Sequence, residues 1–380
     1  MTQVFDAAII GGGLAGCSAA ITLAQHGANV LLLEAKAYPL HRVCGEFLSP
    51  ASANILSELG VLPQVEALHP ALIDRARIVA PDGFCWEADL PGAGLGLTRY
   101  ALDALLAHEA ERLGVCLHTE TTVQDVEGDL DNGFTLTARH DGQIQTYQAR
   151  VVIAAYGKRA NLDRVLNRPF LHRGIQYVGL KNHLRGISIE NRVELYPFPG
   201  GYCGLSQVED GCTNVCLLVR QDVFQRQGAG DISAFIEWMS GQNPALGAWL
   251  ARAEVVHPRW FSISQISFQR KAALEGDLLM TGDSAGLIAP LAGDGMEMAL
   301  HGGRMAGLMA AQFVHERWSA AQLRTQYPKA WRQTFGGRLS LARGLQTLML
   351  RPALLPVGLR ALHRSPALSQ FVIRHTRNAA

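Results

Sequence analysis

A glycine-rich turn and an acidic residue further along the chain have the types and spacing needed to hold a dinucleotide. The turn is Gly11-Gly12-Gly13-Leu14-Ala15-Gly16, and Glu34 lies 23 residues after Gly11. Gly11 permits a tight turn, Gly13 lets the backbone approach a pyrophosphate, and Gly16 lets a helix pack closely on a strand. The carboxylate of Glu34 can accept hydrogen bonds from both ribose hydroxyls and would repel a 2′-phosphate. This motif therefore predicts FAD or NAD, rather than NADP, as the tightly bound ligand.

A second segment with glycines and acids lies far from the first. Its sequence is Gly282-Asp283-Ser284-Ala285-Gly286-Leu287-Ile288-Ala289-Pro290-Leu291-Ala292-Gly293-Asp294-Gly295-Met296. Asp283 follows a short apolar run and can accept hydrogen bonds from the ribityl hydroxyls of a flavin. Pro290, Gly293 and Gly295 leave room for the backbone to pack against a flat ring. The helix predicted from Met296 would point its positive end at the ring's pyrimidine edge, where reduced flavin carries negative charge.

Several side chains that can hold or move a proton are candidates for catalysis. They are Cys44, Glu46, His183 and Tyr202, and Lys181 lies beside His183 in the sequence. The thiol of Cys44 could tune a flavin or supply a proton to a double bond, and Glu46, His183 and Lys181 are suited to acid–base work. In the alternative interpretation, Cys44 is a small buried residue that lets its loop pack.

Strands and helices must position these residues. Val4–Ile10 and Asn29–Leu33 read as buried strands that flank a helix ending near His26. Leu278–Thr281 reads as a strand that returns to the same sheet, and Met296–Val314 reads as a long helix. Because this sheet begins at residue 4 and is revisited near residue 280, a second domain must be inserted between the two segments rather than appended to them.

The middle of the chain is rich in predicted strands and the end is helical. The expected elements are a hairpin at 75–88, a helix at 101–113, strands at 115–126, 134–140, 143–149, 151–155, 175–183, 192–198, 202–207 and 214–220, and helices at 51–59, 222–226 and 232–239. The tail from Ala320 is expected to be helical, with breaks at Pro328, Pro352 and Pro356. We therefore predict an FAD-binding domain (1–70, 97–165 and 276–318), a substrate domain of antiparallel sheet (71–96 and 166–275) and a helical C-terminal segment (319–380).

Composition and charge narrow the function classes. The net charge is +1, which argues against nucleic acid as a partner, and seven scattered cysteines with no metal-binding spacing indicate a cytoplasmic protein with reduced thiols. After Glu316 there are eleven Lys or Arg and no Asp or Glu. For the charges alone, we favour a solvated helical face. The alternative is peripheral contact with an anionic membrane or with an acidic carrier protein, which the apolar stretches Leu345–Leu350 and Val357–Leu359 would also suit.

With both glycine motifs in place, the sequence resembles the glutathione-reductase-type flavoproteins of the p-hydroxybenzoate hydroxylase branch. That branch holds aromatic hydroxylases, squalene-epoxidase-like enzymes, halogenases and geranylgeranyl reductases. The resemblance implies an α/β fold with a Rossmann-like FAD-binding domain, an inserted antiparallel substrate domain, and non-covalently bound FAD. The cofactor-binding residues it implies are Gly11, Gly13, Leu14, Ala15, Gly16, Glu34, Ala35, Arg42, Arg99, Val123, Val126, Gly157, Gly282, Asp283, Pro290, Gly293, Asp294, Gly295 and Met296.

One departure from the family pattern concerns the electron donor. The hydroxylases carry an Asp-Gly pair with a downstream arginine, whereas this chain has Tyr156-Gly157 followed by Arg164. The replacement of the aspartate puts hydroxylase-style docking of nicotinamide in doubt. NADH, NADPH and a separate reductase all remain candidate donors.

The resemblance leaves the reaction open. Cys44-Gly45-Glu46 and Pro199-Gly200-Gly201-Tyr202 are similar to loops that geranylgeranyl reductases place beside the flavin. Monooxygenation of a hydrophobic or aromatic molecule is the favoured expectation, because it is the commoner activity on this scaffold. Its apolar wall is predicted to comprise Phe198, Tyr202, Phe261, Phe268 and Leu291. Reduction of carbon–carbon double bonds is the alternative, and a halogenase or a non-catalytic flavin-binding protein is ranked lower.

Overall fold

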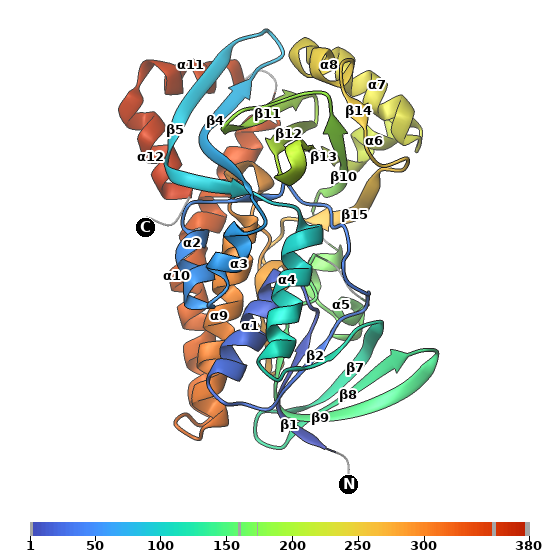
Figure 1. Ribbon diagram of the computed structural model, residues 1–380, viewed down its shortest axis with the longest axis vertical. Helices are drawn as coiled ribbons and strands as arrows, with labels where there is room; N and C mark the ends of the chain where they lie inside the picture. Colours follow the sequence, from blue (N-terminus) through green and yellow to red (C-terminus); the bar gives the residue numbers. More distant parts are fainter. Residues whose placement is uncertain (1–2, 159–160, 173, 352–354, 377–380) are drawn as a thin grey trace.

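The structure, a computed structural model, describes residues 3–158, 161–172, 174–351 and 355–376. Two β-sheets lie one above the other along the long axis of the molecule, with helices around them (Figure 1). The first strand belongs to the lower sheet, and the last helices lie beside the upper one. The parts of the predicted domains that fall on residues 1–2, 159–160, 173, 352–354 and 377–380 lie outside the described residues.

The first sheet has a parallel centre. Its strand order is β16 (Leu274–Glu275), β17 (Leu278–Met280), β9 (Gln143–Ala154), β1 (Val4–Ile10), β2 (Val30–Leu33) and β6 (Cys116–His118). The strands from β17 to β6 are parallel, while β7 (Thr121–Asp129), β8 (Gly133–His140) and the start of β9 pair antiparallel. All of β2 and the last four residues of β1 are buried, as expected for a parallel sheet covered on both faces.

Helices α1 (Leu14–Gln25) and α9 (Gly295–Val314) pack closely because glycines allow it. A Cβ atom at Gly303 would lie 2.1 Å from the backbone oxygen of Ala15. A Cβ atom at Gly282, in the second glycine motif, would lie 2.9 Å from the Cβ of the same alanine. The two glycine motifs are therefore neighbours in space. The remaining helices of this region are α2 (Ser52–Glu58), α3 (Leu62–Glu66), α4 (Arg99–Arg112) and α5 (Leu162–Val165).

The second sheet is mostly antiparallel. Its order is β14 (Glu254–Val255), β10 (Gln176–Arg185), β13 (Thr213–Arg220), β12 (Gly201–Gln207), β11 (Arg192–Phe198), β4 (Ala71–Val79), β5 (Cys85–Gly96) and β3 (Phe47–Leu48), and β15 (Phe261–Ser267) also pairs with β10. Only the β11–β4 pair is parallel among the described strands of this sheet. Helices α6 (Gln221–Gly228), α7 (Ile232–Gln242) and α8 (Pro244–Leu250) share a core with it that includes Phe198 and Phe235.

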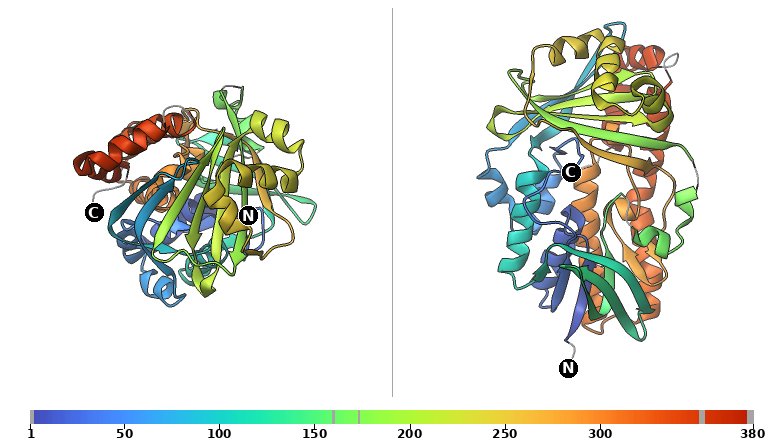
Figure 2. Two further views of the ribbon diagram at one scale, coloured as in Figure 1. Left: turned by 90° about the horizontal axis from the view of Figure 1, so that it is seen from above. Right: turned by 90° about the vertical axis from the view of Figure 1, so that its right-hand side faces the viewer.

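The C-terminal helices close the molecule against both sheets. Helix α10 (Ala320–Met349) runs beside α9, and α11 (Leu355–Arg364) and α12 (Pro366–Thr376) lie beside β4 and β5 (Figures 1 and 2). The indole Nε1 of Trp86 on β5 donates to Ser369 Oγ on α12 at 2.9 Å. Met349, Leu355 and Leu359 join the core of the second sheet. None of the described helices has the length and apolar character that a membrane span requires.

The predicted fold class is confirmed, and the differences lie in single elements. Residues 143–149 and 151–155, expected as two strands, form the single strand β9, while the strand expected at 115–126 is split at Glu120, whose φ is 53°. Strand β3 and helix α8 differ from the prediction, because neither is long enough to show a periodic spacing of apolar residues. The domain boundaries stay a prediction.

The helix break expected at Pro328 is wrong. Helix α10 continues through this proline, although proline in a helix interior costs about 3 kcal/mol. Leu323 and Tyr327 before it, and Trp331 and Phe335 after it, are buried at a spacing of about one turn. The burial of this apolar stripe, which is a tertiary effect, offsets the lost hydrogen bond.

Candidate active site

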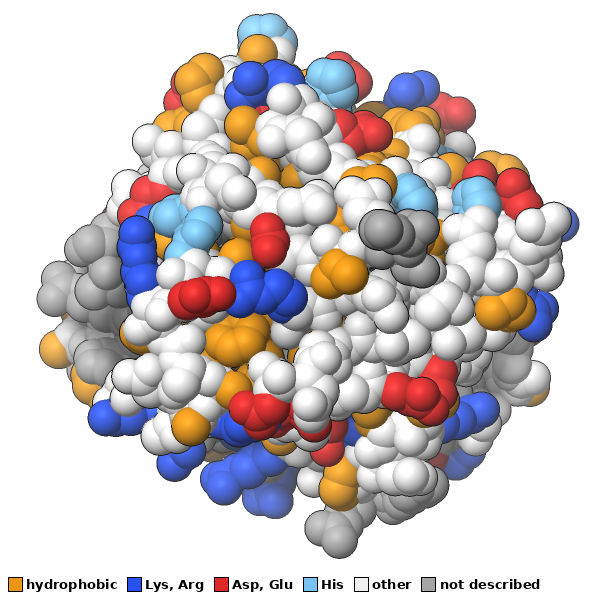
Figure 3. Space-filling view, turned by 90° about the horizontal axis from the view of Figure 1, so that it is seen from below, with side chains coloured by type: hydrophobic (Ala, Val, Ile, Leu, Met, Phe, Trp, Pro, Cys, Tyr) orange, Lys and Arg blue, Asp and Glu red, His pale blue; other side chains and the backbone are white. Residues whose placement is uncertain are grey.

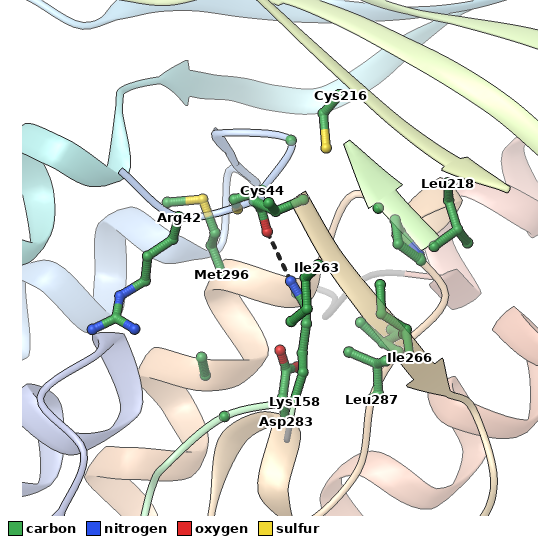
Figure 4. A pocket seen from close by; sticks show the side chains of 18 of the residues that line it. Arg42, Cys44, Lys158, Cys216, Leu218, Ile263, Ile266, Asp283, Leu287 and Met296 are labelled. Atoms are coloured by element: carbon green, nitrogen blue, oxygen red, sulfur yellow. Dashed lines mark hydrogen bonds between the residues drawn. The ribbon is translucent and has the colours of Figure 1, made fainter. Parts of the chain in front are cut away.

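A cavity of about 860 Å³ runs from the first sheet to the C-terminal helices. Gly11, Glu34 and Asp283 line one end, and Leu359 and Ile373 line the other. Strands β1, β2, β9 and β17 all end at this cavity, because the carboxyl ends of parallel strands share one edge. Cys44, Arg42 and Met296 lie at one side of the view in Figure 4, and Leu218, Ile266 and Leu287 lie at the other.

The first glycine motif forms the expected tight turn. Gly11 has a φ of 100°, and a Cβ there would lie 2.7 Å from the backbone oxygen of Ala155. A Cβ at Gly16 would lie 1.8 Å from the oxygen of Gly11, so the turn and the helix can approach only with glycine. Gly13 faces the cavity, with Arg99 3.5 Å from where its Cβ would be.

Glu34 is a buried carboxylate that organises the nucleotide end. Its Oε2 accepts from the backbone N–H of Gly12 at 2.7 Å and from Arg42 at 3.0 Å, and its Oε1 accepts from Lys36 N–H at 3.1 Å. Arg42 also donates to Asp103 at 3.0 Å. Arg42, expected near the flavin from the resemblance, is therefore placed beside Glu34, where it fixes the carboxylate that is predicted to receive ribose.

Arg99 lies above the start of α1. Its guanidinium makes two hydrogen bonds to the buried carboxylate of Asp103, at 2.6 and 2.7 Å. Burial lowers the pKa of Arg99, but the charge of Asp103 more than offsets this and raises it. A fixed cation over Gly13 suits the predicted contact with FAD phosphates. Sequence reasoning missed Asp103, which lies one helical turn after Arg99.

The second glycine motif turns at Gly282 and Gly293, which have φ of 61° and 71°, and leads into α9. Asp294 at the start of α9 does not line the cavity. It forms a buried ion pair with Arg338 of α10, which also pairs with Glu297. Burial raises the pKa of Asp294, and the charge of Arg338 opposes this shift. Sequence reasoning missed Arg338, because nothing in the local pattern connects it to a helix start more than 40 residues earlier.

Three of the acid–base candidates meet in one cluster. Glu46 is fully buried, and one of its oxygens accepts from Lys181 and, at 2.7 Å, from the backbone N–H of Arg99. Its other oxygen lies 2.7 Å from His183 Nε2. Burial alone would raise the pKa of Glu46, but the hydrogen bond from His183 and the charge of Lys181 lower it overall. Glu46 is therefore an ionised structural anchor rather than a ready proton donor.

Cys44 lines the cavity two residues away, with its Sγ 3.5 Å from the backbone N–H of Glu46. Second-sheet residues hold this loop: Asn214 donates to the oxygen of Cys44 at 3.2 Å and Ser206 donates to that of Gly45 at 2.9 Å. Lys158, opposite, donates to the oxygen of Val43 at 2.8 Å (Figure 4). These three supports could not be predicted from the sequence, because the contacts join segments far apart in the chain.

The predicted apolar wall is present apart from one residue. Tyr202, Phe261, Phe268 and Leu291 line the cavity, whereas Phe198 packs into the core against α7. The hydroxyl of Tyr202 accepts from the backbone N–H of Leu291 at 3.1 Å. Burial raises the pKa of Tyr202 well above its usual value, so the phenol stays protonated.

Tyr156 lines the cavity, and its hydroxyl belongs to a buried polar network. Its hydroxyl donates to Asp163 at 2.8 Å and accepts from Arg168 at 3.2 Å. Arg168 is buried and also pairs with Asp163, whereas Arg164, expected to match the family arginine, is exposed. Of the two valines predicted beside the adenine, Val123 lines the cavity and Val126 packs into the first core without lining it.

The comparisons with known proteins agree with this geometry. Residues 4–174 match the family described as FAD binding domain. Residues 4–174 are therefore an FAD-binding domain, and the chain as a whole is similar to FAD-dependent oxidoreductases. The residues present fit this cofactor, since one continuous cavity joins a glycine cradle, the acid that is predicted to receive ribose, and the second glycine motif.

Individual relatives are distant but extend over most of the chain. A digeranylgeranylglycerophospholipid reductase of Methanopyrus kandleri is 28% identical, covering 87% of this chain and 83% of the relative. A menaquinone reductase of Mycolicibacterium smegmatis is 23% identical, covering 97% and 90%. The solved structure of the flavin-dependent brominase Bmp2 superposes with a TM-score of 0.83 at 18% identity, covering 98% and 93%. This last likeness shows the fold alone.

Proposed function

We propose that this flavoprotein reduces carbon–carbon double bonds in a polyprenyl-type lipid. One observation carries the proposal: the cavity extends beyond the flavin-binding residues into an apolar arm. Leu348 and Met349 of α10, Leu359 of α11 and Ile373 of α12 line this arm, together with Leu218 of the second sheet. A long hydrocarbon chain fits such an arm better than a compact phenol does, because each buried CH₂ adds about 0.8 kcal/mol.

The relatives point the same way. The Methanopyrus relative is named as a digeranylgeranylglycerophospholipid reductase, and the Mycolicibacterium relative is named as a menaquinone reductase. This support favours reduction over the monooxygenation that the scaffold alone suggested.

The chain's own residues have definite tasks in this reaction. The bound flavin, once reduced by the electron donor, would supply a hydride to one carbon of the double bond. The Sγ of Cys44 is the cavity group placed to give a proton to the other carbon, and Lys158, Ser206 and Asn214 hold the loop that presents it. Tyr202 and Leu291 exclude water from this end of the arm.

A product analysis tests the reaction. Protein with bound FAD would be reduced chemically without oxygen and mixed with an unsaturated prenyl lipid. A product heavier by two hydrogens supports the proposal. If instead the product gains oxygen, and only when air is admitted, the enzyme is a monooxygenase.

A matched cysteine pair tests the proton donor. Cys44→Ala should lower the yield of saturated product at least tenfold while the FAD content remains normal. Cys212→Ala, in the turn between β12 and β13, should leave the yield unchanged. Equal yields from both variants would remove Cys44 from the mechanism.

We propose a nicotinamide nucleotide or a separate reductase as the electron source. Measuring the rate of flavin bleaching with NADH and with NADPH distinguishes these sources. Bleaching by neither nucleotide would assign the task to a separate reductase.

We also propose that the C-terminal helices contact an anionic membrane surface from which the lipid is taken. Val357 is 64% exposed, Leu368 is exposed on α12, and Arg351 and Arg364 lie nearby in the sequence. By contrast, the face at the opposite end of the molecule mixes acidic and basic side chains (Figure 3). Co-sedimentation with vesicles should fall for Val357→Asp relative to Ile144→Asp, a similarly exposed site on β9. Equal binding would remove the proposal.

A further inference from the structure

Three histidines gather beside the Glu46 cluster but outside the tasks described so far. His41 comes from the loop after β2, His183 from β10 and His257 from the loop after β14. One nitrogen of each ring lies within 4.8 Å of those of the other two. We propose that these three imidazoles bind a transition-metal ion of the zinc class. The proposal is independent of the reaction that the cavity performs.

The distances suit a tetrahedral ion after a small closure. Zn–N bonds of about 2.0–2.1 Å place two tetrahedral ligands about 3.3 Å apart. His183 Nδ1 and His257 Nε2 are already 3.1 Å apart. The His41 nitrogen lies no more than 4.8 Å from the other two nitrogens, so binding an ion requires it to approach them by at most about 1.5 Å. His41 is half-buried and belongs to a loop.

His183 is oriented as a metal-binding histidine would be. Its Nε2 lies 2.7 Å from Glu46, and its Nδ1 shares a hydrogen bond with His257 Nε2 at 3.1 Å, a contact that a bound ion would replace. A carboxylate behind a ligand imidazole fixes the tautomer and increases its basicity. The carboxylate is itself held by Lys181 and by the backbone of Arg99, so this support is rigid.

His41 gives a second, independent indication of a ligand. Its Nδ1 is buried and has no hydrogen-bond partner among the described residues. Buried polar atoms are nearly always satisfied, so an orphan next to two other imidazoles marks a place for a missing partner.

Three histidine ligands would leave the fourth coordination position of the ion open, and the bound ion would link two parts of the fold. With three protein ligands, water or an anion would complete the tetrahedron, and a bound hydroxide would offset part of the metal charge. His41 directly precedes Arg42, which holds Glu34, whereas His183 and His257 belong to the second sheet region. A bound ion would therefore tie the nucleotide-binding loop to the second sheet.

Metal uptake by the full-length holoprotein is the test. After removal of metal with a chelator, titration with Zn²⁺ should give one equivalent bound, and Co²⁺ should give tetrahedral d–d absorption at wavelengths beyond the flavin bands. His257→Ala should weaken binding at least tenfold, and His41→Ala should do the same. The control, His108→Ala on the exposed face of α4, should bind as the unaltered chain does.

Two results would overturn the proposal. The first is unaltered protein that takes up neither Zn²⁺ nor Co²⁺, which decides the question without any variant. The second is uptake that is equal in the His257→Ala, His41→Ala and His108→Ala proteins, since the ion would then be bound elsewhere. The FAD content of each variant, read from its flavin absorbance, shows that the fold is retained.

Discussion

Glu46 and Lys181 form an ion pair in which neither side chain is exposed to solvent. They lie 135 residues apart in the sequence, and the pair joins the loop after β2 to strand β10. Glu46 has a φ of 53°, a left-handed conformation that costs a non-glycine residue about 1–3 kcal/mol. The contacts made by its carboxylate therefore hold the Cys44 loop in a shape that its own backbone disfavours.

Removing the cation of this pair should be costly. Lys181→Met leaves the buried charge of Glu46 with less compensation, so we expect the free energy of unfolding to fall by about 3–5 kcal/mol in a guanidinium titration. The matched control is Lys329→Met, at an exposed position of α10, which should change the free energy of unfolding by less than about 0.5 kcal/mol. The double variant, Glu46→Gln with Lys181→Met, should lose less unfolding free energy than the two single variants lose together. Strict additivity would contradict the coupling.

The contact between α1 and α9 gives a second prediction. Gly303→Ala places a Cβ 2.1 Å from the oxygen of Ala15, so the helices must move apart. We expect a loss of about 1–3 kcal/mol in unfolding free energy, and weaker retention of FAD. Gly337→Ala on α10 meets nothing within 4 Å and should stabilise the protein by up to about 1 kcal/mol. Equal unfolding free energies and equal FAD retention in the two variants would show that the close contact at Gly303 does not require glycine.

The two glycine motifs could be predicted from the sequence because each is contiguous. Gly11 to Gly16 and Gly282 to Gly295 carry their conformational requirements in neighbouring residues, and the strands around them are apolar runs. The cluster around Glu46 could not be assembled in this way, because its members meet only when β10 is docked on the loop. One signal was available: Lys181 and His183 are two residues apart in the same strand, so their side chains share a face.

The ion pairs of Arg338 likewise could not be predicted from the local sequence. Its partners Asp294 and Glu297 lie at the start of α9, and the pairing depends on how α10 lies along α9. The continuation of α10 through Pro328 is a related case, since a local rule is outweighed by burial on both sides. Tertiary packing decides both features.

The apolar arm gives a prediction about substrate length. Leu348→Trp adds bulk to a cavity-lining position of α10, so turnover of long prenyl chains should fall at least tenfold. Short prenyl chains, which end before the arm, should be turned over at close to the original rate. Thr347→Trp, on the exposed neighbouring position, is the control and should affect neither. An equal loss of turnover for long and short substrates would show that the prenyl chain does not occupy this arm.

Lys271 gives a prediction about pH. Its ammonium is buried, donates to the backbone oxygen of Asp283 at 2.7 Å and lies 4.4 Å from the ring centroid of Phe170. Burial lowers the pKa of Lys271 from 10.5 to about 8. Between these values the unfolded chain binds more protons than the folded one, so this residue makes stability rise with pH across that window, by up to about 3 kcal/mol.

Lys271→Met should therefore remove this rise, while Lys329→Met should keep it. Unfolding free energies from urea titrations at several pH values between 8 and 10.5 give the comparison. Tyrosine and cysteine residues titrate in the same window in all three proteins, so the difference between the curves isolates Lys271. Because the lysine is charged in the folded state only at the lower end of this range, removing its desolvation cost should separate the two variants most there, and their curves should converge toward the upper end. Parallel curves for Lys271→Met and the unaltered protein would show that the ammonium is not desolvated.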